Sequence, residues 1–139
     1  MLLLFVKIKS MNFCKTWKTR PEILLMVMAA AMPIAFWAWV VLLNNFTVEV
    51  ASFTGKEIGI LQSLREVPGF LSFLVVYLLL IIAEQRLALL SLFILGVGVA
   101  LTGYFPTIIG LYITTVISSI GFHYYEACHQ SLSLQWLDK

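Results

Sequence analysis

The sequence predicts an all-α, polytopic membrane protein with four transmembrane helices. Its 139 residues are 61% hydrophobic and only 12% charged, whereas soluble domains carry about 25% charged residues. The hydrophobic residues gather in four long runs, and a helix needs about 20 such residues to cross a bilayer. The runs are continuously apolar, which excludes a transmembrane β-barrel because barrel strands alternate apolar and polar positions. We therefore expect residues 23–139 to lie in a lipid bilayer, behind a basic tail over residues 1–22.

Charge and cysteine usage exclude several classes of function. The formal net charge of +2 gives no strong attraction to nucleic acid. Cys14 and Cys128 show no metal-ligand spacing, and the sequence contains no phosphate-binding loop, hydrolytic triad or metal-binding cluster. We expect neither enzyme activity nor a metal or cofactor.

The tail leads directly into the first span. Five cations and no acidic residue precede Pro21, and Met11 is an alternative start that would leave residues 1–10 untranslated. Proline suits the first turn of a helix but interrupts a helix interior. We predict the first span over residues 23–43, with a kink at Pro33.

Three further spans follow a polar connection. We predict them over residues 58–82, 87–104 and 108–136. Pro68 and the glycine after it should break the second span. A short cytoplasmic turn with Glu84 and Arg86 joins it to the glycine-rich third span.

The distribution of cations predicts the orientation. Seven Lys and Arg residues outside the spans fall on the side of the two termini, and Lys56 alone falls on the other side. Cytoplasmic loops carry the excess of cations in membrane proteins. We expect both termini in the cytoplasm and the chain in the inner (plasma) membrane of a bacterium.

The fourth span carries a polar stripe. At 100° per residue, its polar side chains fall within an arc of roughly 80°. They are Tyr112, Thr115, Ser119, His123, Glu126, Gln130 and Ser133. Such a stripe needs an aqueous cavity or a polar partner helix, because ionisable groups are costly in lipid. The alternative is that Glu126 lies at the cytoplasmic border, where water solvates it.

His123 and Glu126 are the most informative pair of the stripe. They are three residues apart, so one helix face carries both. A histidine beside a carboxylate exchanges a proton near neutral pH. If the stripe lines a cavity for a solute, we expect this pair to contact that solute or to couple its movement to protons.

Arg65 and Glu66 form a second polar group, inside the second span. Adjacent helical residues point about 100° apart, so we expect no pairing between these two. Arg65 should also lie too near the outer border to meet Glu126. We expect its partner at the outer end of the first span, from Asn44, Asn45 and Glu49. The group would lock the first two spans together or contact the substrate directly.

Taken in order, these features resemble the amino-terminal part of a major facilitator superfamily transporter. The supporting segments are the basic tail before a kinked helix, Gly59-Ile-Leu-Gln-Ser-Leu-Arg-Glu-Val-Pro-Gly69, the short turn, the glycine-rich span and Gly121-Phe-His-Tyr-Tyr-Glu126. The resemblance covers residues 20–139, about the first four of the family's twelve helices. It implies that the first and fourth helices line a central cavity. The turn departs from the family pattern, because Glu84-Gln85-Arg86 contains no glycine.

The resemblance implies a fragment of a secondary active transporter for a small solute. Alternating access rocks one half of such a carrier against the other, so we expect the fragment to be inactive without its missing helices. The alternative is a complete four-helix subunit or small exporter that acts as a homodimer. A small exporter typically needs a carboxylate deep in the first span, and none lies between Glu22 and Glu49. A product without activity is the third possibility.

Overall fold

The computed structural model describes residues 21–137. These residues form helices and connecting turns, with no strand among them. Four of the helical segments are long and apolar enough to cross a membrane, which confirms the predicted fold class. Most of the predicted basic tail, together with Met11 and Cys14, lies outside the described residues, as does Lys139.

The first helix is longer than predicted. Helix α3 (Pro21–Glu49) continues through Pro33 without interruption and ends six residues beyond position 43. Asn44 and Thr47 near its end do not terminate it, because their side chains find hydrogen-bond partners on the neighbouring helix and on α3 itself. Thr47 is fully buried and donates a hydrogen bond to the Asn44 carbonyl at 2.8 Å.

The second span is interrupted where proline predicts it. Helix α4 (Gly55–Phe70) contains Pro68, and it gives way to the 3₁₀ turn η1 (Leu71–Leu74) and the short helix α5 (Val75–Leu79). Proline lacks the N–H that an α-helix requires and crowds the preceding turn. At its other end α4 begins with a cap, in which the Thr54 N–H donates to Glu57 Oε2 at 2.9 Å.

Helices α6 (Glu84–Thr102) and α7 (Ile108–Leu137) form the most closely packed pair of the bundle. Small residues allow the close approach. A β-carbon added at Gly121 would lie 2.5 Å from the Leu95 nitrogen, and one at Gly98 would lie 2.7 Å from the Ser118 nitrogen. Small residues at a helix interface are the usual means of packing helices in lipid.

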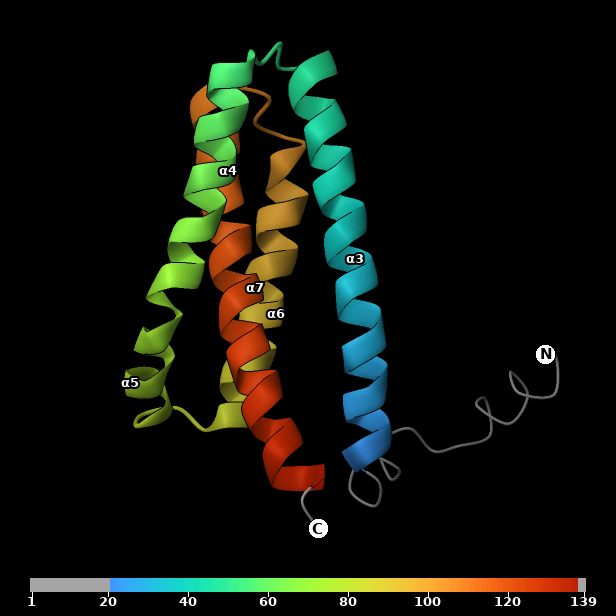
Figure 1. Cartoon of the computed structure of the whole chain (residues 1–139), viewed down its shortest axis with the longest axis vertical. Coiled ribbons are helices and arrows are strands. Elements are labelled where there is room, and N and C mark those ends of the chain that lie inside the picture. Colours follow the sequence, from blue (N-terminus) through green and yellow to red (C-terminus); the bar gives the residue numbers. More distant parts are fainter. Residues whose placement is uncertain (1–20, 138–139) are drawn as a thin grey trace, which may run out of the picture.

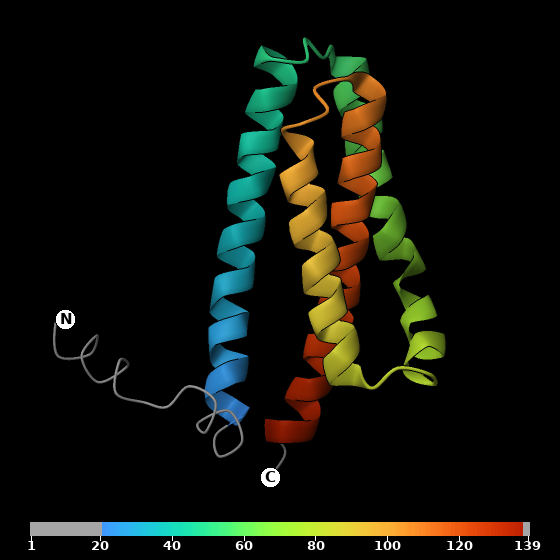
Figure 2. The ribbon, with the colours of Figure 1, turned by 180° about the vertical axis from the view of Figure 1, so that it is seen from behind.

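Helix α7 is the centre of the bundle. It packs against α6, α4 and, more loosely, α3. Figure 1 and the reverse view in Figure 2 show that the start of α3, the α5–α6 connection and the end of α7 lie together at one end. The α3–α4 and α6–α7 connections lie at the opposite end.

Two clusters of buried side chains occupy the two ends of the bundle. Near the α3–α4 connection, Phe36, Trp39 and Leu43 pack with Leu61 and Leu111. Toward the other end, Leu25 and Met32 of α3 pack into a cluster with residues of α5, α6 and α7. Helix α3 thus contacts its neighbours through long side chains, and polar side chains collect between the two clusters.

Candidate functional site

A cavity of about 370 Å³ opens between α3, α4 and α7. Its lining residues are Pro33, Phe36 and Trp37 of α3, Arg65 and Glu66 of α4, and Phe122, His123 and Glu126 of α7. The Trp37 residue is 62% exposed and the Glu66 side chain 63% exposed, so the cavity is open on their side. Pockets of this size hold small organic molecules.

The missing side chain at Gly69 of α4 makes room for the imidazole of His123. A β-carbon added at Gly69 would lie only 2.7 Å from His123 Cε1 and 2.8 Å from Nε2. The glycine that follows Pro68 therefore forms a recess in which the imidazole sits. The sequence predicted a break at Pro68 and this glycine, but nothing in it pointed to the contact with α7.

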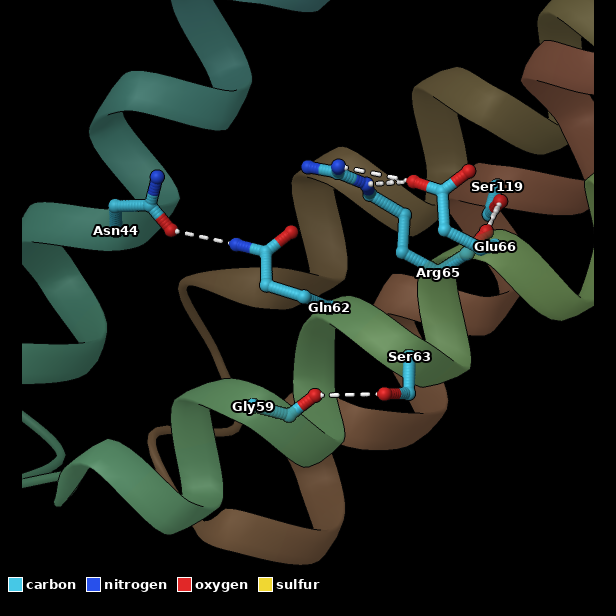
Figure 3. Close-up of polar contacts among 7 residues, drawn as sticks. All are labelled: Asn44, Gly59, Gln62, Ser63, Arg65, Glu66 and Ser119. Carbon is cyan, nitrogen blue, oxygen red and sulfur yellow. Dashed lines mark hydrogen bonds and ion pairs between the residues drawn. The ribbon is translucent and has the colours of Figure 1, made fainter.

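The guanidinium of Arg65 pairs with the carboxylate of Glu66. Both Nη2, at 3.0 Å, and Nε, at 3.1 Å, donate to Glu66 Oε1, as Figure 3 shows. The expectation that these neighbours would not pair is wrong. Their β-carbons point in different directions, but the arginine side chain is long enough to reach across the helix surface to the adjacent carboxylate.

The carboxyl-terminal end of α3 is linked to α4 by amide groups instead of charges. Gln62 Nε2 donates to Asn44 Oδ1 at 3.1 Å, also visible in Figure 3. Asn45 and Glu49 are exposed, and within residues 21–137 the ion pair of Arg65 is with Glu66 alone. The predicted network of Arg65 with Asn45 or Glu49 is therefore wrong, because the Glu66 carboxylate lies within its reach on the same helix.

Arg65 and Glu126 line the same cavity, although we expected a difference in depth to keep them apart. Their long side chains enter the cavity from different levels of α4 and α7. The register between these helices is fixed by Ser119, whose hydroxyl donates to the Arg65 carbonyl. His123 lies one turn further along α7, between that contact and Glu126.

The polar stripe of α7 divides into two parts. Toward the α6–α7 connection it packs against protein: the Tyr112 hydroxyl donates to the Glu57 carbonyl at 3.3 Å, and Ser119 bonds α4. Thr115 between them is fully buried, and its hydroxyl has no partner among the described residues. His123 and Glu126 line the cavity.

The remaining stripe residues lie beyond the cavity. Gln130 is exposed, and the Ser133 hydroxyl donates to the His129 carbonyl at 2.8 Å. Glu84 and Arg86, in the first turn of α6, are also remote from the cavity. Glu84 Oε2 accepts a hydrogen bond of 2.7 Å from Gln135 Nε2 of α7, whereas Arg86 is exposed.

The apolar part of the cavity wall was not predicted. Phe36 stacks on Phe122 with ring centroids 3.7 Å apart, and Trp37 meets Phe36 edge-on at 6.1 Å. In a span that is apolar on every side, an aromatic residue that faces a cavity looks the same as one that faces lipid. These rings are recognised as cavity residues only by their position opposite the polar stripe of another helix, and this position is known only from the structure.

Within residues 21–137 no group of three or more His, Cys, Asp or Glu side chains is arranged to hold a metal ion. No protein-family model, curated protein or solved structure matches this chain. The cavity and the four apolar helices are therefore the features that bear on function.

Proposed function

We propose that the chain is part of a membrane transporter for a small solute and that the cavity between α3, α4 and α7 binds this solute. One observation carries the proposal: Arg65, Glu66, His123 and Glu126 converge on one cavity from two otherwise apolar helices. Ionisable groups in membrane spans are costly and mark solute or proton pathways. The resemblance to the amino-terminal part of a major facilitator superfamily transporter points to the same role.

The open side of the cavity favours a carrier with more helices than these four. Trp37 and Glu66 stand exposed at the opening, and the outer face of α3 presents many large apolar side chains. Further helices of the same transporter would close the cavity, and alternating access requires a second half to move against. A second copy of the chain is the alternative source of that wall, as in a homodimeric exporter.

In the proposed orientation the chain spans the inner membrane of a bacterium, and both of its termini face the cytoplasm. Arg86 lies in the first turn of α6, at the end where α3 begins and α7 ends. Lys56 lies in the first turn of α4, at the opposite end. With the cations before Pro21, this arrangement follows the positive-inside rule.

Cysteine labelling tests whether water reaches the cavity. In a chain with Cys14→Ser and Cys128→Ala, we expect Glu126→Cys in proteoliposomes to react with a hydrophilic maleimide. The matched control is Ile113→Cys, an exposed apolar position on the same helix, which we expect to face lipid and to remain unlabelled. Equal protection of both positions would contradict a solute cavity.

A flux measurement tests transport itself. Proteoliposomes that contain the full chain would be offered labelled benzyltrimethylammonium, phenylacetate and glucose, one probe of each charge class. If two copies of the chain form a complete carrier, one probe should enter faster than into protein-free liposomes, and Glu126→Gln should remove that advantage; a chain that needs further helices should give no flux alone. Glu49→Gln changes an exposed carboxylate outside the cavity and should leave it intact. Entry of no probe would refute transport by this chain alone.

A further inference from the structure

We infer that the cavity selects a monovalent organic cation with a flat, aromatic body. This inference rests on the proposed function, because it assigns a solute class to the same cavity. It follows from three features of the wall: the pairing of its charges, the placement of its aromatic rings and its size.

The charges of the wall leave one carboxylate without a counter-charge. The Arg65 guanidinium is satisfied by Glu66 through two bonds of 3.0 and 3.1 Å, and the Arg65 side chain is only 20% exposed. Among the described residues, Glu126 has neither an ion pair nor a hydrogen bond from another side chain. Counted with Arg65, Glu66 and Glu126 ionised and His123 uncharged, the cavity wall has one negative charge in excess.

This arrangement disfavours an anionic solute. An anion entering the cavity would meet a guanidinium that already has a carboxylate partner, and it would lie near the unpaired carboxylate of Glu126. A cation would instead supply the missing counter-charge in a site where an unpaired charge is costly. The charge pattern of the wall therefore favours a cationic solute over an anionic one.

The aromatic rings favour a cation with an apolar body. Trp37 stands at the opening and is 62% exposed, and indole is the best aromatic partner for a cation. The stacked pair of Phe36 and Phe122 forms an apolar wall behind it. A sugar would find few hydrogen-bonding groups along this wall, whereas the flat body of an aromatic amine can pack against it.

The volume of the cavity sets the size of the cation. About 370 Å³ lies near the lower end of the range for small-molecule sites, roughly 300–1,000 Å³. A cation with a single ring fits this volume. We therefore choose benzyltrimethylammonium as the probe, because it has one ring and one permanent charge that no protonation step can alter.

The test is equilibrium binding of labelled benzyltrimethylammonium to the full chain in lipid nanodiscs, with unlabelled phenylacetate and benzyl alcohol as competitors. We expect saturable binding that neither competitor displaces. Glu126→Gln should weaken it about tenfold, the effect of about 1.4 kcal/mol, and Trp37→Leu about two- to fivefold. Glu126→Asp keeps the charge and should keep most of the affinity, and the exposed control Glu49→Gln should bind as the wild type does.

Glu66→Gln gives a second, independent test because it frees the Arg65 guanidinium. Cation binding should weaken in this variant, and phenylacetate should become a competitor. Far-UV circular dichroism of each variant verifies that the helices are intact. If Glu66→Gln leaves the preference between cation and anion unchanged, the charge argument is wrong.

The outcomes separate this inference from the proposed function. Three results would overturn the solute class. Phenylacetate could displace the bound probe from the wild type as well as the unlabelled cation does, Glu126→Gln could leave binding unaffected, or the folded chain could fail to bind the probe. Flux of phenylacetate without flux of the cation would overturn the class and leave transport standing. Selective cation binding without flux would leave the class standing and show that this chain alone does not transport the solute.

Discussion

Gly121 of α7 lies directly against the α6 backbone, and replacing this residue should destabilise the bundle measurably. A β-carbon at position 121 would lie 2.5 Å from the Leu95 nitrogen and 2.6 Å from the Ser91 carbonyl oxygen. Ordinary contacts begin at 3.4 Å, so α6 would have to retreat by about 0.9 Å. Both obstructing atoms belong to the α6 backbone, which cannot rotate away as a side chain could.

The expected loss of stability in Gly121→Ala follows from the cost of overpacking. Inserting a methyl group into a well-packed interface costs typically ~1–3 kcal/mol, and close packing drives helix association in lipid. Gly96→Ala is the matched control on α6, because no heavy atom lies within 4 Å of its added β-carbon. There the change should be neutral or should stabilise the helix by ~0.5–1 kcal/mol, since alanine loses less backbone entropy on folding.

Reversible unfolding in mixed SDS and mild-detergent micelles, followed by far-UV circular dichroism, measures the free energy of unfolding of both variants. We expect Gly121→Ala to unfold at a lower SDS fraction than the wild type, and Gly96→Ala at the same or a higher one. Gly98→Ala, whose β-carbon would lie 2.7 Å from the Ser118 nitrogen, should follow Gly121→Ala. If Gly121→Ala is as stable as Gly96→Ala, α6 and α7 do not pack as described.

Three further changes test the cavity and its supports. Gly69→Ala should displace the imidazole of His123, which would lie 2.7 Å from the new β-carbon; a changed ring chemical shift in NMR with little loss of stability is expected, and an unchanged shift would contradict the recess. Asn44→Ala and Gln62→Ala remove the amide bond between α3 and α4, so a double-mutant cycle should give a coupling near ~0.6 kcal/mol, the average for such bonds in membranes, and no coupling would show that the bond does not form. Thr54→Ala removes the hydroxyl that donates to the Glu57 carboxylate and keeps the backbone N–H bond to it. Faster amide hydrogen exchange confined to the first turn of α4 should result; exchange at the wild-type rate would show that the hydroxyl contributes nothing to the cap.

The helices could be predicted because their signal is strong and local. Continuous apolar runs identify the spans, and Pro68 marks the break in the second. The end of α3 was missed because Asn44 reads as a polar terminus. In the structure its side chain accepts a hydrogen bond from Gln62 and its carbonyl accepts one from Thr47, so the helix continues through it.

The candidate site was predicted only where its residues are conspicuous in an apolar chain. His123 and Glu126 stand out because ionisable groups are rare in spans, whereas Phe36 and Phe122 resemble every other apolar position. The error over Arg65 has a different origin. Directions of β-carbons decide contacts for short side chains, but a long guanidinium samples partners on several sides, and the nearest carboxylate is on the adjacent residue.

The distribution of small residues indicates which part of the bundle can change shape. Gly98 and Gly121 bring α6 and α7 into backbone contact, and backbone contacts of this kind leave no room for sliding. Helix α3 touches α7 loosely and through long side chains such as Phe36, which can repack when the helix shifts. Opening or closing the cavity would therefore move α3 against α7 and the α4 segment that Ser119 bonds to it. The cavity lies between the fixed part and the part that can move, as the proposed carrier function requires.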